Sequence, residues 1–328
     1  MVERLDLADF ENHCGHFDEA IKAMEGIDHF CSSSDWIIPA YHAFHATHEL
    51  FLYKLDQGYL PLARGFQPAV GRYLAPLEAM WGLASPIATA HPKEMIPALL
   101  DHVLSIQSEW DTLWFCGLNR HSPFFLSLAT QFSAVFQVGL GPETLRHTAS
   151  LHGGWNGYLG RRSTKFRTNL KRVLRGFESR GFETTYYADA MDPDAGEALY
   201  DRMVGIESRS WKGEADTGIK EESMNTFYRR MVRRLAQRGG LRALIATHEG
   251  VDVAFVFGGV QRGVFRGLQL SFDNAFRSHS LGNVMQGLMI QRLCEEGLHT
   301  YDLGTDLEYK RRWSEPGLQT DVIAFIKT

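Results

Sequence analysis

Cysteine is scarce in this chain, and its spacing argues against a fold held together by disulfides or by structural zinc. The 328 residues include only four cysteines, at Cys14, Cys31, Cys116 and Cys294. They form no Cys-x-x-Cys pair and have no zinc-ligand spacing. Domains held by disulfides carry denser cysteine frameworks, so we expect free thiols in a reducing, cytoplasmic setting.

Long hydrophobic runs and a leader pattern are lacking as well. The most apolar uncharged stretch covers residues 122–140, and it carries polar side chains such as Thr130 and Gln131. This composition predicts a buried helix that runs into a strand, and no membrane span. Residues 1–6 are charged and lead into no apolar segment, which does not fit a secretory signal peptide.

The chain as a whole has no excess of positive charge. Its formal net charge is −5 at pH 7, so we expect no DNA partner. Residues 161–180 differ, because they hold eight lysines and arginines and a single acid, Glu178. Phe166, Leu170 and Val173 recur there at helical spacing, which predicts a basic amphipathic helix ending at Gly181. Its charged face fits a solvated helix between domains, and it also fits an anionic ligand or RNA.

The rest of the chain alternates between helical and strand patterns. In the first half we expect helices over residues 36–48 and 92–109 and strands over residues 50–55, 59–63 and 111–116. In the second half we expect helices over residues 194–210, 222–238 and 280–296 and strands over residues 241–247, 251–260, 264–272, 299–303 and 320–326.

A short polar loop at residues 277–282 lies between a predicted strand and a predicted helix. A helix N-terminus presents unpaired backbone N–H groups, which suit a phosphate. Gly282 allows close approach to the backbone, Ser280 can cap the helix, and Arg277 can add a charge-assisted contact. The same residues also fit a capped helix that follows a loop and carries a solvated arginine.

Four segments of the second half resemble CelD-type acetyltransferases of the GNAT superfamily, which are related to FemAB-type peptidyltransferases. They are residues 155–159 with 165–172, residues 207–213, residues 271–273 with 280–282, and residues 301–304 with 308–310 and Trp313. The resemblance maps the GNAT pyrophosphate pattern onto Arg277, Ser280 and Gly282, with Leu281 and Asn283 beside them. Ser280 stands where the pattern usually has glycine.

The resemblance implies an α/β fold of tandem GNAT-like domains, each a mixed, mostly antiparallel sheet flanked by helices. We expect an N-terminal GNAT-like domain over residues 1–150, without a cofactor because it shows no pyrophosphate-type loop. A basic bridging helix would follow over residues 151–185, where it could also meet the 3′-phosphate of CoA. A C-terminal GNAT domain over residues 186–328 would bind acyl-CoA.

Acyl transfer from a thioester to an amine needs a route for the amine proton and a donor for the leaving thiolate. Asp273, at the end of a predicted strand, and Glu207, near the end of a predicted helix, are the candidate bases. Asp273 also fits an ordinary turn aspartate. The resemblance assigns the thiolate side of the reaction to Tyr309 and Lys310, although a surface basic run explains these residues as well.

The acceptor amine would contact Trp211, Lys212 and Asp306, although Trp211 also fits a packing role. A second cluster, formed by His42, His45, His48 and Glu49, has the helical spacing of metal ligands. No matching partner pattern occurs elsewhere, and the resemblance implies no metal, so we expect none.

We therefore expect an N-acyltransferase that moves an acetyl or longer acyl group from acyl-CoA to an amine. The acceptor would be a small molecule or an envelope-polysaccharide precursor. One alternative is a FemAB-like transferase that uses aminoacyl-tRNA, which the basic helix favours. Another is a non-catalytic binding protein on the same fold.

Overall fold

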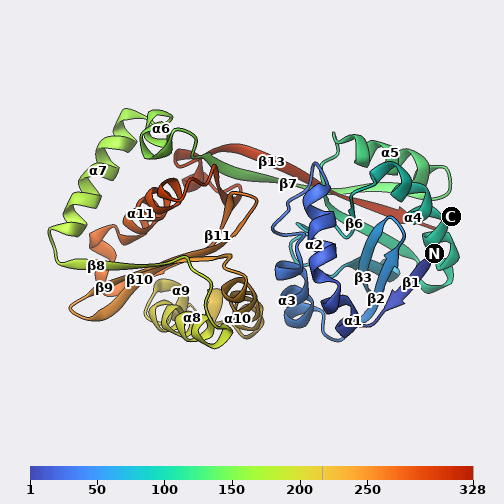
Figure 1. Cartoon of the computed structure of the whole chain (residues 1–328), viewed down its shortest axis with the longest axis horizontal. Coiled ribbons are helices and arrows are strands. Elements are labelled where there is room, and N and C mark those ends of the chain that lie inside the picture. The colour runs from blue at the N-terminus through green and yellow to red at the C-terminus, as the bar shows by residue number, and fades with distance from the viewer. Residues whose placement is uncertain (216, 328) are drawn as a thin grey trace. The chain divides into compact units, whose positions relative to one another are not determined.

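A computed structural model describes residues 1–215 and 217–327, and the chain forms two compact units (Figure 1). Unit 1 comprises Met1–Leu145 together with the segment that begins at Leu318. Unit 2 is the continuous segment Arg146–Gly317. Two long strands, β7 (Gln137–Ser150) and β13 (Glu315–Ile326), each begin in one unit and end in the other.

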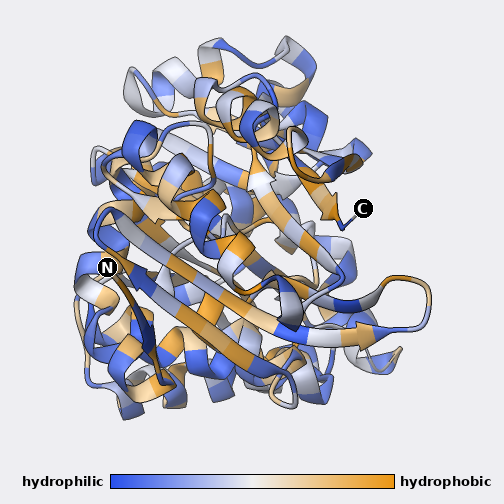
Figure 2. Ribbon diagram, turned by 90° about the vertical axis from the view of Figure 1, so that its right-hand side faces the viewer, coloured by the Kyte–Doolittle hydropathy of each residue, from blue (hydrophilic) through white to orange (hydrophobic). Residues whose placement is uncertain are grey.

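Unit 1 is a mixed sheet with helices packed on it. Its strands follow the order β1 (Val2–Leu5), β2 (Glu49–Leu55), β3 (Gly58–Gln67), β4 (Gly71–Pro76), β6 (Thr112–Leu118) and β13, with the short β5 (Ala88–Thr89) beside β3. Its helices are α1 (Leu7–Asn12), α2 (Cys14–Ala23), α3 (Ser34–Phe44), α4 (Pro92–Ser105) and α5 (Pro123–Ser133). Hydrophobic residues run along the strands, and hydrophilic residues are prominent on the surrounding helices (Figure 2).

Unit 2 is built in the same way. Its strands follow the order β8 (Phe182–Tyr187), β9 (Leu241–His248), β10 (Val251–Gln261), β11 (Val264–Phe272), β12 (Thr300–Thr305) and β7. The helices α6 (Gly154–Gly160), α7 (Thr164–Glu178) and α11 (Leu281–Glu295) cover one face of the sheet (Figure 1). The helices α8 (Pro193–Glu207), α9 (Trp211–Glu214) and α10 (Glu222–Gln237) cover the other face (Figure 1).

The two units share one topology. In each sheet the fourth and fifth strands are parallel and are joined by a helix, α4 between β4 and β6 and α11 between β11 and β12. The other pairs of neighbouring strands described within each unit are antiparallel. A parallel pair needs such a crossover, because a tight turn reverses the chain direction. The chain therefore has the predicted α/β class, with mixed, mostly antiparallel sheets flanked by helices.

The core of unit 2 holds α11 firmly against the sheet. Leu281, Val284, Met285, Met289 and Leu293 are fully buried in it, as their helical spacing predicts. The basic helix α7 packs on α11 through its apolar stripe, with Leu170 at the contact. Residues 151–185, expected to bridge two domains, thus lie within unit 2.

Most of the predicted helices and strands are present, with ends shifted by a few residues. Four strands were missed, namely β1, β4, the two-residue β5 and β8. The predicted helix over residues 92–109 ends at Ser105, and a short 3-10 turn, Gln107–Glu109, follows it. Residues 122–140 form α5 and the start of β7, as their composition predicts. Within the described residues, we find no helix with the length and apolarity that a bilayer crossing requires.

Candidate functional site

A cavity of about 570 Å³ opens in unit 2 where strands β11 and β12 part. The two strands pair only along Val264–Arg266 of β11, so residues 267–272 have no partner strand on that side. A shift of register between Phe257 and Gly258 of β10 bends the neighbouring strand at the same level. Residues 267–272 all line the cavity, so the open edge of β11 forms one of its walls.

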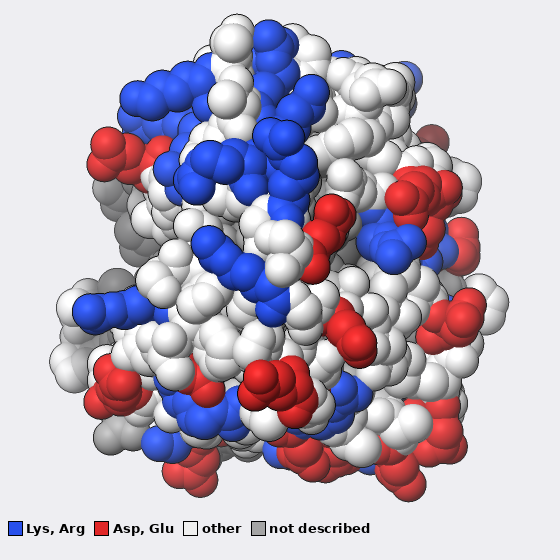
Figure 3. All heavy atoms as spheres, turned by 90° about the vertical axis from the view of Figure 1, so that its left-hand side faces the viewer, with Lys and Arg blue, Asp and Glu red and all other residues white. Residues whose placement is uncertain are grey.

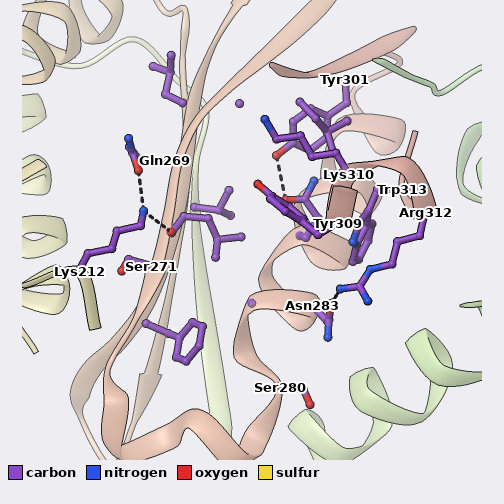
Figure 4. Close-up of a pocket in the computed structure, with 18 of the residues that line it drawn as sticks. Lys212, Gln269, Ser271, Ser280, Asn283, Tyr301, Tyr309, Lys310, Arg312 and Trp313 are labelled. Carbon is purple, nitrogen blue, oxygen red and sulfur yellow. Dashed lines mark hydrogen bonds between the residues drawn. The ribbon is translucent and has the colours of Figure 1, made fainter. Parts of the chain in front are cut away.

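The open edge of β11 divides the cavity into two sides (Figure 4). Lys212 and Gln269 lie on one side, toward α9, and Tyr309, Arg312 and Asn283 lie on the other, toward α11 (Figure 4). A ligand that passes the strand edge could therefore meet a second ligand coming from the opposite side.

The first turn of α11 presents free backbone donors to the cavity. The carbonyl oxygen of Ser280 accepts the N–H groups of Asn283 (3.0 Å) and Val284 (3.2 Å). Within the described residues, the N–H groups of Leu281 and Gly282 donate to no carbonyl oxygen outside the helix, and a first turn offers them none inside it. Ser280, Gly282 and Asn283 line the cavity, so this turn can bind an anion.

Ser280 does not cap α11 in the way its side chain predicts. It occupies the N-cap position, but its backbone is left-handed, with φ of 58° and ψ of 31°, and its hydroxyl makes no cap hydrogen bond. A capping serine normally has an extended backbone, which aims the hydroxyl at the N–H groups of the helix. The cap prediction is therefore wrong, and the left-handed backbone explains why glycine suits this position.

Two arginines supply positive charge near this turn. Arg277 and Arg312 both line the cavity and are exposed. Arg312 donates to Asn283 Oδ1 at 3.3 Å, and neither arginine has a carboxylate partner among the described residues. Their charge is therefore available to an anionic ligand.

On the other side of β11, Lys212 reaches the strand from α9. Its Nζ donates to Gln269 Oε1 (2.9 Å) and to the carbonyl oxygen of Leu270 (3.2 Å). Glu207 lies behind it, fully buried, with Oε2 at 3.7 Å from Nζ and Oε1 accepting the Ile219 N–H. Burial lowers the pKa of Lys212, and the nearby Glu207 carboxylate partly offsets that effect.

Lys310 lies at the far wall, over a cluster of buried charges. Its Nζ donates to the carbonyl oxygen of Thr305 at 2.8 Å. Asp302 takes ion pairs from Arg266 (2.8 Å) and Arg146 (3.4 Å), so two positive charges lie close to Lys310 beside this carboxylate. Burial, and then repulsion from Arg266, lowers the pKa of Lys310 to about 8.

Tyr309 precedes Lys310 on the short turn η4 (Glu308–Arg312) and extends into the cavity (Figure 4). Its ring lies 5.9 Å from Lys310 Nζ. Burial raises the pKa of its hydroxyl above the ordinary tyrosine value, at which the group is already protonated at neutral pH and can donate a hydrogen bond.

Two buried polar atoms of the cavity wall lack partners within the described residues. They are Ser271 Oγ and Gln286 Nε2, although Gln286 Oε1 accepts the Tyr301 hydroxyl at 3.2 Å. A buried polar atom without a hydrogen bond is costly unless a ligand or water satisfies it. An acyl-CoA fits these residues, because its pantetheine arm carries amide groups and its pyrophosphate suits the N-terminus of α11.

The cavity brings together eight of the twelve residues predicted for the site. They are Trp211, Lys212, Arg277, Ser280, Gly282, Asn283, Tyr309 and Lys310. Leu281 is buried beneath the turn, where only its N–H can serve a ligand. Glu207, Asp273 and Asp306 are not part of the cavity wall.

The three carboxylates outside the wall have protein partners instead. Asp273 accepts the Ala275 N–H at 2.9 Å and pairs with Arg209 at 2.6 Å, and Glu207 is held behind Lys212. Asp306 pairs with Arg311 (2.8 Å) and His147 (2.9 Å), and the Arg311 hydrogen bond lowers the pKa of Asp306.

Twelve of the twenty residues of the wall were not predicted for the site, among them Gln269, Gln286 and Arg312. Gln286 follows Asn283 by three residues on α11 and so shares its face, a signal that was present in the pattern. Arg312 lies within a basic run that gave no reason to single it out. Gln269 depends on the parting of β11 and β12, which pattern does not reveal.

The histidine cluster of unit 1 provides no ligand set. Within residues 1–215 and 217–327, no group of three or more His, Cys, Asp or Glu side chains is arranged to hold a metal. The rings of His45 and His48 lie 4.9 Å apart, and both ring nitrogens of His45 are buried with no hydrogen-bond partner among the described residues.

Comparison with known proteins shows what the fold and the site of unit 2 resemble. Residues 164–311 match the family model of the acetyltransferase (GNAT) domain, and they contain every predicted site residue. The matched residues lie within unit 2, which is therefore similar to a GNAT domain over most of its length. A search of curated proteins found no match for this chain.

Solved structures share the fold over both units. FemX is similar with a TM-score of 0.63 and 13% identity, over 97% of this chain and 96% of its own. A conserved protein of unknown function from Bacteroides thetaiotaomicron aligns over the whole of both chains, with a TM-score of 0.61 and 13% identity. L-PGS from Bacillus licheniformis has a TM-score of 0.58 and 10% identity, over 99% of this chain and 93% of its own. At these identities the likeness establishes the fold alone.

Proposed function

We propose that unit 2 transfers an acyl group from an acyl-CoA to an amine on a small molecule or an envelope-polysaccharide precursor. The observation that carries the proposal is the combination of the free N–H groups of Leu281 and Gly282 with the parted strands β11 and β12. The first feature suits a pyrophosphate, and the second leaves a strand edge to which the extended pantetheine arm can bond.

The donor would lie on the α11 side of the open strand edge. The N–H groups of the first turn, with Arg277, would hold the pyrophosphate. Gln286 Nε2 and the backbone of residues 267–272 would bond to the pantetheine amides, which would satisfy a buried donor that has no partner among the described residues. The acceptor would enter on the Lys212 side, past Trp211, whose side chain is exposed.

When bound, the thioester supplies an acyl carbon to which the amine nitrogen adds, so that a C–N bond forms and the C–S bond breaks. Tyr309 would donate its hydroxyl proton to the departing thiolate, and the tyrosinate would regain a proton from water, which takes up the proton that the amine loses. The ammonium group of Lys310 would stabilise the developing negative charge from the same wall.

Among the described residues, the twenty that line the cavity include no Asp, Glu or His. The proposal therefore assigns the loss of the amine proton to water. The positive charges of Lys212 and Lys310 would lower the pKa of an amine held between them, because like charges disfavour its protonated form. Asp273 and Glu207 would act in structure, through the contacts with Arg209 and Lys212.

We propose no cofactor for unit 1, whose corresponding loop is closed by its own chain. The loop between β4 and α4 folds around Glu78, whose buried carboxylate accepts the N–H groups of Trp81 (2.6 Å), Leu83 (2.9 Å) and Ala84 (3.3 Å). Pro92 occupies the first turn of α4 and has no N–H to offer.

A thermal-shift series with CoA esters of increasing chain length tests the donor. Acetyl-, succinyl- and palmitoyl-CoA would be compared with free pantetheine. A ligand at one hundred times its Kd stabilises the folded state by roughly 2.7 kcal/mol, so the preferred ester would raise the melting temperature clearly. If no ester shifts the transition at millimolar concentration, the proposal fails.

A second candidate donor is an aminoacyl-tRNA, and the exposed face of α7 favours it. Lys and Arg side chains gather over this face (Figure 3), where Lys165, Lys171, Arg172 and Arg175 are exposed and have no carboxylate partner among the described residues. The fold is also shared with FemX. This donor predicts tRNA binding that weakens steeply with salt. It also predicts no stabilisation by CoA esters.

A further inference from the structure

A second cavity, of about 240 Å³, adjoins the main one at the N-termini of α7 and α11. We call it the side cavity; it is lined by Ser163, Lys165, Phe166, Asn169, Leu170, Asn283, Arg312 and Trp313. Asn283, Arg312 and Trp313 line both cavities, so a ligand on the first turn of α11 can extend into each of them. The side cavity is smaller than a complete small-molecule site, and its size suits one end of a larger ligand.

The side cavity is cationic. Lys165 and Arg312 are exposed at its wall, with no carboxylate partner within the described residues, and none of the eight lining residues is an acid. Asn169 and Asn283 add amide groups, of which Asn283 Oδ1 accepts from Arg312 at 3.3 Å. Two cations together with amide donors suit a phosphate monoester, which carries close to two negative charges at neutral pH.

Aromatic rings form the apolar part of the same wall. Phe166 meets the buried Trp313 edge to face, with 4.8 Å between ring centroids and 89° between planes. Phe166 is itself half-buried, so part of its ring stays open to a ligand. Flat rings of this kind receive nucleobases by stacking.

We propose that the side cavity binds the 3′-phosphoadenosine end of the CoA donor, with Lys165 and Arg312 on the 3′-phosphate and Phe166 beside the adenine. This inference rests on the proposed function, because it follows the donor outward from the pyrophosphate. It assigns the start of the basic helix α7 to donor recognition. It also makes unit 2 selective for free CoA thioesters over acyl groups on a carrier protein, whose phosphopantetheine arm ends without adenosine.

Calorimetric titration of the whole chain with CoA and with dephospho-CoA, which lacks only the 3′-phosphate, tests this assignment. We expect CoA to bind about tenfold more tightly, the ratio that one added charged hydrogen bond supplies. Lys165→Met should reduce that ratio toward one and leave the affinity for dephospho-CoA unchanged. Arg312→Met should act in the same direction, while Lys171→Met, an exposed lysine of α7 outside the side cavity, should keep the full ratio.

The outcomes separate the two proposals. If neither CoA nor dephospho-CoA binds, the proposed function fails, and this inference fails with it. If both bind with equal affinity to the unaltered chain, or if Lys165→Met keeps the full preference for CoA, the side cavity does not hold the 3′-phosphate. In that case the proposed function stands and only this inference is overturned.

Discussion

The carbonyl oxygen of Ser280 accepts the N–H of Val284 at 3.2 Å, although Ser280 itself has a left-handed backbone with φ of 58°. The chain thus makes a tight reversal at this residue and begins α11 directly after it. A residue with a Cβ atom adopts this conformation at a cost of roughly 1 kcal/mol, which glycine avoids. The position is one where the backbone, rather than the side chain, forms the site.

Substitutions at Ser280 should therefore follow backbone preference. Ser280→Gly should keep CoA binding and change the free energy of unfolding by less than about 1 kcal/mol, since relief of strain offsets added freedom in the unfolded chain. Ser280→Pro should abolish CoA binding, because proline fixes φ near about −65°. Denaturant unfolding and CoA titration of both variants measure this. Equal CoA affinity of the proline variant and the unaltered chain would contradict the assignment of this loop.

Substitutions at Tyr309 and Asp273 should distinguish a residue that takes part in acyl transfer from one that stabilises the fold. Tyr309→Phe should lower the rate of acyl transfer by a factor of about 100 and leave CoA affinity unchanged, because only the leaving thiolate needs its proton. Asp273→Asn should retain most of the activity and lose about 1 kcal/mol of stability, since it weakens a cap and an ion pair. Thiol release with a panel of amines, and denaturant unfolding, distinguish these effects. The opposite pattern would restore Asp273 as the base.

The lowered pKa of Lys310 should make the free energy of unfolding depend on pH in the alkaline range. Its pKa is lowered to about 8 in the folded chain, from 10.5. Between these values the unfolded chain binds more protons, so stability rises as pH rises through this window. Between pH 7.5 and 9.5, the free energy of unfolding of the unaltered chain should increase by up to about 2 kcal/mol more than that of Lys310→Met. Denaturant unfolding at both values measures the difference, and Lys171→Met is the exposed control.

The lowered pKa of His45, in unit 1, should make the stability of the fold depend on pH in the acid range. Burial, and then repulsion from His48, lowers the pKa of His45 from 6.5 to about 4. As pH falls through that window, only the unfolded chain takes up the proton, so stability falls. His45→Leu should flatten this dependence, whereas His16→Leu, at an exposed position, should not. Unfolding midpoints at pH 7.5 and 5 test the effect, and parallel slopes for His45→Leu and the unaltered chain would refute it.

The elements that the sequence predicts well are those whose own periodicity carries the signal. The face of α11 could be foreseen from Leu281, Val284 and Met285, and the three strands before it from alternation and turn residues. The strand β8 was missed because it follows the basic helix closely, after Gly181, and its six residues carry a weak pattern. The loop at residues 277–282 was located correctly as a helix start, but its backbone conformation was not.

Many residues of the candidate site could be predicted from the sequence, whereas the shape of the cavity that they line could not. Lys212 and Lys310 are about a hundred residues apart in the chain, and only the fold brings both to one cavity. The parting of β11 from β12 after Arg266 has no local pattern, because it depends on how two strands pair. Asp273 was a reasonable base on position alone; its partner Arg209 lies 64 residues earlier, in the turn between α8 and α9.

The two strands that pass between the units bear on the order in which the chain can fold as it is made. Unit 2 is one continuous segment, whereas the sheet of unit 1 includes β13, which pairs with β6 through contacts such as Ile326 with Thr112. Most of that strand follows unit 2 in the chain. Unit 1 is therefore synthesised first, but its sheet can be completed only after unit 2 has been synthesised. Pairing over so long a separation is slow. Until it occurs, β6 presents an unpaired edge, at which an unfinished chain is prone to aggregate.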